Sequence, residues 1–386
     1  MLMELSGDAF WAVDPRVQMK KARQKYRMRV FNSVGGLVSL VTDSKIRKVQ
    51  HAILPRTPNH NAVTTLDDVI IRAQARFPQA TGELTHLMLD ITLACKFIAR
   101  QITQSAIKDL HDVSRVRETL ARKTQRLEAF AAEQMRYALD RSGNTCLMIS
   151  DADGSEVQRL SATDGRYVVV VDPLDGTPNI AFNAPVCTTF SVYRRTSPAD
   201  MLPGSHESLQ PGNRMVVGGY VLYGSSTMLV FTAEGMGVNF FTMDPGTGEF
   251  FLANGDVRIP DFKKAFSMNA GWAPYWDEPV RRYLDHAVAN RYAYRYGGSM
   301  VADIHRILME GGLFAYPADA RYPDGKLHLL YKCAPLAFVV EQAGGVAIDG
   351  RQRILDIVPE HVHQTVPIFI GSPGNIDELT TFLNTD

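Results

Sequence analysis

The sequence predicts a layered α/β or α+β protein made of two units that meet near residue 257. The chain has 386 residues, more than the roughly 250–300 that usually share one hydrophobic core. Helical patterns come first, short β-branched and aromatic runs follow them, and a second alternation of helices and strands completes the chain. We therefore expect an N-terminal extension over 1–60, a first unit over 61–257 and a second unit over 258–386.

Three helices are predicted at the start of the first unit. Thr64 or Thr65 can cap the first, before LDDVIIRAQARF, which has two acids in its first turn. The second begins at Glu83, and residues 109–140, charged on one face and apolar on the other, form the third. The apolar residues of the second helix recur at helical spacing: Leu84, Leu87, Met88, Ile91, Cys95 and Ile98.

Strand patterns then replace the helical ones. They are short β-branched and aromatic runs bounded by turns, at 147–150, 166–172, 187–195, 214–224 and 227–235. Residues 196–213, rich in Pro, Gly and Ser, are expected to form a surface loop. In the second unit we expect helices at 277–289, 301–310 and 335–343 and strands at 327–331 and 366–370.

Composition and charge exclude several classes of protein. Lys and Arg number 41, as do Asp and Glu, which argues against a dedicated nucleic-acid-binding protein, because such a protein needs a basic surface. No apolar run reaches the about 18 residues that a membrane helix needs. The four cysteines lack CxxC spacing, so we expect neither a disulfide framework nor a cysteine zinc site, and a reducing, cytoplasmic location.

The first 60 residues end in a stretch rich in Pro, His and Asn, which we interpret as a linker. The N-terminal residues include Glu4, Asp8 and Asp14 without an apolar core, unlike a signal peptide. Residues 16–29 are strongly basic. They are either part of an organelle-targeting segment or, as the simpler interpretation, a solvated arm or the product of an upstream start codon.

The most informative motif is VVVVDPLDGTPN, residues 168–179. Four valines predict a buried strand, and Asp172 and Asp175 follow it in a turn whose Pro and Gly let two carboxylates converge. Two carboxylates and a free carbonyl, that of Leu174, are ligands that Mg²⁺ prefers. Backbone N–H groups after Gly176 can bind a phosphate oxygen. An ordinary turn is the alternative interpretation.

Two further motifs carry basic residues. In RYGGSMVADIHR, residues 295–306, Arg295 and Tyr296 precede a Gly-Gly-Ser junction and a helix. Arginine suits bidentate capture of phosphate, although a surface arginine before a glycine turn is the alternative. Lys326 follows a Pro-Asp-Gly turn and opens a strand, and Lys332 ends that strand before a Pro-initiated helix.

Together these stretches resemble the class I fructose-1,6-bisphosphatase family, over about residues 64 to 375. The shared motifs occur in the family's order: TGELT (81–85), DPLDGTPN (172–179), GYVLYGSST (219–227), FSMN (266–269), RYGGSMVADIHR (295–306) and GKLHLLYKCAPLAFVVEQAGG (325–345). The resemblance implies a five-layered α/β/α/β/α fold, a homotetramer, and Mg²⁺- or Mn²⁺-dependent hydrolysis of fructose 1,6-bisphosphate in gluconeogenesis or Calvin-type metabolism.

The resemblance also implies roles for individual residues. Asp172, Asp175 and the Leu174 carbonyl match metal ligands, with Asp151 as a further one. The 1-phosphate turn corresponds to Asp175, Gly176 and Thr177. The remaining substrate positions are Asn269, Trp272, Arg295, Tyr296, Met300, Tyr316 and Lys326, and Arg295 matches an arginine lent by a neighbouring subunit. An inhibitory AMP site corresponds to Thr81, Gly82, Glu83, Leu84, Thr85, Arg166 and Tyr167.

The departures from the family concentrate at the metal cluster. Lys332 replaces a metal-binding glutamate, Ser150-Asp151-Ala152 replaces a serine and two glutamates, and Glu128 replaces a catalytic aspartate. Pro178 replaces a serine of the phosphate turn, and Trp272 replaces a tyrosine. Exchanging one glutamate for alanine and one for lysine makes the site three charges more positive, so fewer ions than usual are expected.

Four interpretations of these departures stay open. The Lys332 ammonium can occupy the position of a missing metal and bind phosphate. Hydrolysis can instead be lost, which leaves a regulatory paralogue that binds phosphosugar or AMP, or the sugar-phosphate specificity can be altered. The alignment of 125–156 can also be shifted by a few residues. If hydrolysis occurs, a cation held by Asp172, Asp175 and Asp151 activates a water that Glu128 orients or deprotonates.

Overall fold

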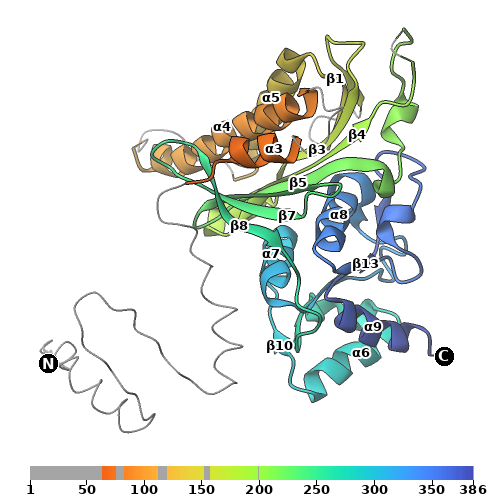
Figure 1. Ribbon diagram of the computed structural model, residues 1–386. Helices are drawn as coiled ribbons and strands as arrows, with labels where there is room; N and C mark the ends of the chain where they lie inside the picture. Colours follow the sequence, from red (N-terminus) through yellow and green to blue (C-terminus); the bar gives the residue numbers. More distant parts are fainter. Residues whose placement is uncertain (1–62, 75–81, 112–119, 152–156, 199, 386) are drawn as a thin grey trace, which may run out of the picture. The chain divides into compact units, whose positions relative to one another are not determined.

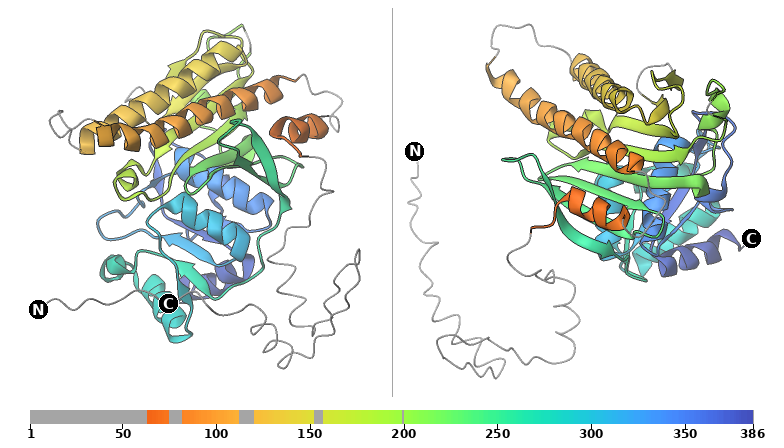
Figure 2. Two further views of the ribbon diagram at one scale, coloured as in Figure 1. Left: turned by 90° about the vertical axis from the view of Figure 1, so that its left-hand side faces the viewer. Right: turned by 45° about the horizontal axis from the view of Figure 1, so that its top comes forward.

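The computed structural model describes residues 63–74, 82–111, 120–151, 157–198 and 200–385. Residues 63–386 form one compact unit. The predicted linker, the basic segment 16–29, Thr81 and Ala152 lie outside the described residues. Figures 1 and 2 show alternating layers of helix and sheet, which confirms the five-layered α/β/α/β/α arrangement expected from the resemblance.

The first layer consists of helices α3 (Leu66–Gln74), α4 (Glu83–His111) and α5 (Leu120–Ser142). Thr65 caps α3: its hydroxyl accepts from the Asp68 N–H at 3.2 Å, and Asp68 accepts from the Thr65 N–H at 2.9 Å. The predicted third helix began too early, since 109–111 belong to α4 and α5 begins at Leu120. α4 packs on α5, and α5 packs on the large sheet (Figure 1).

The large sheet has eight strands among the described residues, in the order β2-β1-β3-β4-β5-β6-β7-β8. β1 and β3 are parallel, and the other neighbours are antiparallel. The strands are β1 (Thr145–Ser150), β2 (Val157–Arg159), β3 (Tyr167–Asp175), β4 (Val186–Arg194), β5 (Met215–Tyr223), β6 (Thr227–Ala233), β7 (Val238–Met243) and β8 (Phe250–Val257).

The four valines of β3 explain why this sheet is covered on both faces. Val168 and Val170 belong to the core beneath α7 and α8, whereas Val169 and Val171 belong to the core beneath α4 and α5. Side chains alternate along a strand, so an uninterrupted apolar run places half its members in each core. α7 (Met300–Glu310) and α8 (Ala334–Gln342) form the middle helical layer.

The outer half consists of a small sheet and two covering helices. Its order is β10-β9-β11-β15-β13, and α7 and α8 contact it from one side while α9 contacts it from the other (Figures 1 and 2). The elements are β9 (Ala265–Ser267), α6 (Glu278–Ala289), β10 (Ala293–Tyr294), β11 (Leu313–Tyr316), β13 (Val346–Ile348), β15 (Ile368–Gly371) and α9 (Pro373–Leu383).

Several expectations need correction. The predicted strand 327–331 is strand only at β12 (Leu327–His328), which pairs with β14 (Thr365–Val366), and η5 (Leu329–Cys333) is a single π-helical turn. The predicted loop 196–213 contains two short 3-10 turns, η2 (Ser205–Ser208) and η3 (Gly212–Arg214). The sequence did not predict the strands β2, β7, β8, β9, β10, β11 and β13 or the helix α9. None of these strands has a long alternating pattern.

Candidate active site

Two carboxylates converge at the carboxyl end of β3. Three steps along β3, from Asp172 to Asp175, oppose two steps along β4. Residues three apart in a regular strand point to opposite faces, so the extra residue of this bulge lets both carboxylates face one side. The Thr188 hydroxyl donates to the carbonyl oxygen of Pro173 at 2.7 Å and holds the bulge against β4.

Lys332 lies between these carboxylates. Its Nζ is 2.6 Å from Asp175 Oδ1, 2.9 Å from Asp172 Oδ2 and 4.0 Å from Asp151 Oδ2. The side chain is only 15% exposed. One ammonium group therefore bridges three acids that the sequence analysis assigned to metal binding.

The backbone around Lys332 is fixed by the large sheet. The Thr189 hydroxyl on β4 donates to the carbonyl oxygen of Tyr331 at 2.5 Å. This hydrogen bond anchors η5, and π-helical turns occur frequently at functional sites. Two adjacent threonines of β4 thus hold the acidic bulge and the turn that carries Lys332.

Burial has the largest single effect on both charged partners. It raises the pKa of Asp172, to about 6, against the lowering effect of the Lys332 ammonium. Burial alone would lower the pKa of Lys332, but the charges of Asp172 and Asp175 together raise that pKa above its ordinary value. Lys332 is therefore a permanent cation at neutral pH.

The divalent cation expected from the sequence does not fit between Asp172 and Asp175 in this arrangement. Their oxygens are the right donor type for Mg²⁺, but the ammonium of Lys332 already lies at hydrogen-bonding distance from one oxygen of each. A cation between the same two oxygens requires Lys332 to move aside. Assignment of Asp172, Leu174 and Asp175 as metal ligands stays a prediction.

The predicted phosphate turn follows the bulge directly. Gly176 has φ +78°, a left-handed conformation that glycine adopts without steric cost. η1 (Thr177–Phe182) begins there, and Pro178 takes one of its first positions. The Thr177 hydroxyl donates to Glu128 Oε1 on α5 at 2.5 Å. The structure thus brings the predicted catalytic Glu128 to the predicted 1-phosphate turn.

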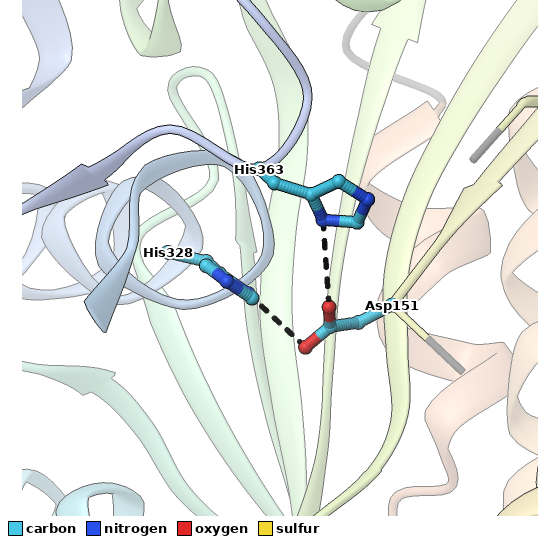
Figure 3. Close-up of side chains that lie close together, drawn as sticks. All are labelled: Asp151, His328 and His363. Carbon is cyan, nitrogen blue, oxygen red and sulfur yellow. Dashed lines mark hydrogen bonds and ion pairs between the residues drawn. The ribbon is translucent and has the colours of Figure 1, made fainter. Parts of the chain in front are cut away.

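A second group of side chains lies beside Lys332 (Figure 3). His328 Nδ1 is 3.1 Å from Asp151 Oδ2, and His363 Nδ1 is 3.8 Å from Asp151 Oδ1. Burial would raise the pKa of Asp151, but the hydrogen bond with His328 and nearby positive charge lower it below the ordinary value. The sequence analysis assigned Asp151 and missed both histidines, which lie 35 residues apart and belong to no recognised spacing.

The residues predicted to bind the 6-phosphate lie in the outer half of the molecule. Burial raises the pKa of Tyr296, and the neighbouring Tyr316 raises it further. A hydrogen bond with Asn269 lowers the same pKa and so opposes these two effects. These three side chains are therefore close together. Arg295 and Tyr296 line a pocket of about 350 Å³. Its other lining residues are Tyr294, Gly297, Asp303 and Arg306.

The other predicted substrate residues have different neighbours. Trp272 is partly exposed and stacks on the Arg321 guanidinium, 3.8 Å from the ring centroid. Lys326 Nζ is 5.3 Å from the centroid of the Tyr322 ring, which Arg321 also contacts. Met300 is the first residue of α7 and packs against the core that lies beneath α7 and α8. Whether these residues bind substrate stays a prediction.

The predicted AMP residues gather where α4 begins. Gly82 has φ +82°, and the helix starts at Glu83, whose Oε2 is 3.4 Å from the Arg166 guanidinium. Tyr167 follows Arg166 at the start of β3. The Thr85 hydroxyl donates to Gln74 Oε1 at 2.9 Å. Leu84 packs against the core that lies beneath α4 and α5. The site's ligand stays a prediction.

No helix in the described part of the chain is both long enough and apolar enough to cross a membrane.

The layered fold, with clustered carboxylates beside the predicted phosphate turn, is that of the metal-dependent sugar phosphatases. Family models described as the N-terminal and C-terminal domains of fructose-1-6-bisphosphatase match residues 64–255 and 259–384. A "Fructose-1,6-bisphosphatase class 1" of Nitratidesulfovibrio vulgaris (strain DP4) is 42% identical over 325 residues, which cover 82% of this chain and 96% of the relative.

Solved structures agree with the sequence matches. Leishmania major fructose-1,6-bisphosphatase in its holo form is 34% identical with a TM-score of 0.77, and in its T-state the TM-score is 0.75. Each comparison covers 84% of this chain and 100% of the Leishmania chain. The chain therefore belongs to the fructose-1,6-bisphosphatase family, a family of metal-dependent phosphatases.

Proposed function

We propose that the protein hydrolyses the 1-phosphate of fructose 1,6-bisphosphate to give fructose 6-phosphate and inorganic phosphate. The observation that carries this proposal is the contact of Glu128 with Thr177, in the turn that directly follows Asp172 and Asp175. The named relatives act as fructose-1,6-bisphosphatases. The proposal assigns the same reaction to this chain.

Lys332 binds and stabilises charge in this scheme. Its ammonium is fixed between two carboxylates, within reach of the turn that holds the phosphate by backbone N–H groups. A fixed cation lowers the energy of the negative charge that develops on the phosphoryl group and on the departing sugar oxygen. Because its pKa is raised, Lys332 acts through its charge and does not supply a proton.

Glu128 is the general base of the proposed reaction. Its Oε1 accepts a hydrogen bond from Thr177 at 2.5 Å, which fixes the carboxylate beside the phosphate turn. The other carboxylate oxygen can orient the attacking water and accept its proton. The carboxylate on α5 and the phosphate turn on η1 thus form one reaction site.

A divalent cation, proposed as Mg²⁺ or Mn²⁺, supplies positive charge to the phosphate and lowers the pKa of a water when it is bound. Asp151 is its proposed ligand in the arrangement described, and Asp172, Asp175 and the Leu174 carbonyl are further proposed ligands that an ion reaches only when Lys332 moves aside. Since Lys332 contacts two of these carboxylates, we propose that fewer ions bind than is usual for the family, with Lys332 in place of one.

The 6-phosphate is proposed to bind in the outer half of the molecule, with Asn269, Tyr296, Tyr316 and Lys326 as donors. Of these, Tyr296 lines the pocket beside Arg295, and Arg295 is proposed to serve a neighbouring subunit of a homotetramer. AMP is proposed to bind where α4 begins, at Gly82 to Thr85 with Arg166 and Tyr167. Support for the second site is the glycine turn before a long helix, since helix N-termini attract phosphate.

A second candidate function is a regulatory paralogue that binds phosphosugar or AMP without hydrolysing it. The observation that favours it is the ammonium group in the acidic cluster. A phosphatase of altered sugar-phosphate specificity is a variant of the main proposal, favoured by Trp272 and Pro178 in the predicted binding site.

The test is phosphate release from fructose 1,6-bisphosphate and from other sugar bisphosphates, by the full chain, over a range of Mg²⁺ and Mn²⁺ concentrations. We expect metal-dependent release that is fastest with fructose 1,6-bisphosphate. Absence of release, together with a rise in melting temperature on adding the sugar bisphosphate, would support the regulatory paralogue instead. Release only from another sugar bisphosphate would establish the altered specificity.

A further inference from the structure

We propose that Asp151, His328 and His363 bind a divalent transition-metal ion beside the phosphate site, with Zn²⁺ preferred to Mg²⁺. The three ligand atoms lie within 4.8 Å of one another. Figure 3 shows both imidazoles directed toward the same carboxylate. This inference deepens the proposed function and rests on it for the role of the ion in hydrolysis, whereas metal binding can be measured without turnover.

Three separate elements hold the ligands together. Asp151 follows β1 at the edge of the acidic cluster. His328 ends β12, and in the antiparallel pair with β14 it lies opposite Thr365. The Leu329 N–H donates to the Gln364 carbonyl at 2.8 Å, so the backbone that leads to His363 is tied to the backbone after His328. The two imidazole ring centroids are 5.6 Å apart as a result.

The distances suit an ion with short bonds. Tetrahedral Zn²⁺ has ligand bonds of about 2.1 Å, which places its ligand atoms about 3.4 Å apart. His328 Nδ1 is 3.1 Å from Asp151 Oδ2, and His363 Nδ1 is 3.8 Å from the other carboxylate oxygen, Oδ1. The three ligand atoms lie within 4.8 Å of one another, so binding requires them to move closer together. All three side chains are partly exposed, so an ion and a water can enter.

The ligand types decide the class of metal. Mg²⁺ prefers oxygen ligands and binds imidazole poorly, whereas two imidazoles and one carboxylate suit Zn²⁺ and similar first-row ions. Three protein ligands of this kind leave a fourth position open for water or substrate, as in catalytic zinc sites. Asp172 and Asp175, by contrast, offer only carboxylate oxygens, and the cation that lies between them is the ammonium of Lys332.

The local charge agrees with a divalent ion at this position. Asp151, Asp172 and Asp175 contribute three negative charges, and Lys332 offsets one of them. Two negative charges remain for a divalent cation to balance. Lys332 Nζ is 4.0 Å from Asp151 Oδ2, so an ion bound to Asp151 and the ammonium can face the same phosphate group.

The test uses the full chain after removal of metal with a chelator, titrated with ZnCl₂, MnCl₂ and MgCl₂ by calorimetry and checked by elemental analysis. The variants are His363→Ala, His363→Gln and Asp151→Asn. The control is His361→Ala, which removes an exposed histidine two residues away. Melting temperatures without metal identify any variant that fails to fold, and the two His363 variants give independent readings.

We expect the parent to bind one equivalent of Zn²⁺ at least tenfold more tightly than Mg²⁺. That equivalent is weakened at least tenfold in both His363 variants and in Asp151→Asn, and is unchanged in His361→Ala. Equal Zn²⁺ binding by the parent and the folded variants would overturn the inference. If Zn²⁺ binding depends on His363 but no phosphate is released, the metal site is upheld and the proposed function is rejected. If phosphate is released with Mg²⁺ but the parent and the variants bind Zn²⁺ equally, the metal site is rejected and the proposed function is upheld.

Discussion

Lys332 is the side chain that most limits metal binding at the end of β3. Its ammonium is 2.6 Å from Asp175 and 2.9 Å from Asp172. The resemblance to the family predicts a glutamate at this position, so the presence of a lysine is visible in the sequence alone. The position of Lys332 was predictable because the flanking motif is long. The contact between His363 and Asp151 was not predictable, because His363 lies in a turn that belongs to no motif. The pairing of β12 with β14 places this turn beside Asp151.

Substitution of Glu128 tests its proposed role as the general base. Glu128→Gln removes the base but keeps an acceptor for the Thr177 hydroxyl, so kcat should fall about 100-fold or more while KM changes little. The control, Glu133→Gln, changes an exposed acid on the same helix and should leave kcat unchanged. A Glu128→Gln enzyme with the kcat of the parent would show that Glu128 is not the base.

His305 gives the second prediction. Burial lowers its pKa from 6.5 to about 4, and its Nδ1 lies 2.8 Å from the Tyr220 hydroxyl. The unfolded chain therefore binds more protons between these pH values, and the free energy of unfolding should fall as pH drops from 6.5 to 4, by up to about 3 kcal/mol.

The measurement for His305 is urea unfolding from pH 7 to pH 4, compared with His305→Gln, which keeps hydrogen-bonding atoms and does not titrate in this range. The parent should lose more stability than the variant on acidification. Parallel losses in the two proteins would show that His305 does not cause the pH dependence.

Among the helices and strands, the sequence predicted most helices, although not α9, and the strands β1, β3, β4, β5 and β6, but it did not predict the π-helical turn η5. The four valines predicted β3 because a strand covered on both faces is apolar throughout. Residues 327–331 have the composition of a strand, but only Leu327 and His328 pair with β14, and the chain then forms η5. The Tyr331 carbonyl of η5 accepts a hydrogen bond from Thr189, a residue about 140 positions earlier, and no local pattern reveals this contact.

Gly325 provides a prediction about this element. It has φ +78°, and a Cβ there would lie 2.1 Å from the carbonyl carbon of Val366. Gly325→Ala should therefore push β12 away from β14, lower the melting temperature by several degrees and weaken Zn²⁺ binding. Gly224→Ala, whose Cβ meets nothing closer than 3.7 Å, is the control. A Gly325→Ala protein that melts with the control would contradict this account of the turn.

For the whole molecule, α7 and α8 connect the two sheets. Val168 and Val170 of the large sheet share one core with residues of both helices and with Ile368 and Ile370 of the small sheet. The matched family models divide the chain near residue 257, and our division into 61–257 and 258–386 stays a proposal about the units. Because the middle core belongs to both, we expect residues 63–386 to unfold in one cooperative transition.

Tryptophan fluorescence can test this expectation. Trp272 and Trp276 both lie in the second half of the chain, so in a Trp11→Phe background their signal reports that half alone. Urea transitions followed by fluorescence and by far-ultraviolet circular dichroism should coincide. Two separated transitions would show that the halves fold as independent units.

In the proposed phosphatase, the ammonium of Lys332 takes the place of one divalent cation. The most direct measurement of this role is the metal-dependent release of phosphate from fructose 1,6-bisphosphate by the parent, Lys332→Met and Lys332→Glu, assayed side by side. We predict release by the parent and a loss of at least 100-fold in kcat for Lys332→Met, which lacks the charge at similar side-chain volume. A silent parent whose activity appears only in Lys332→Glu would contradict the claim.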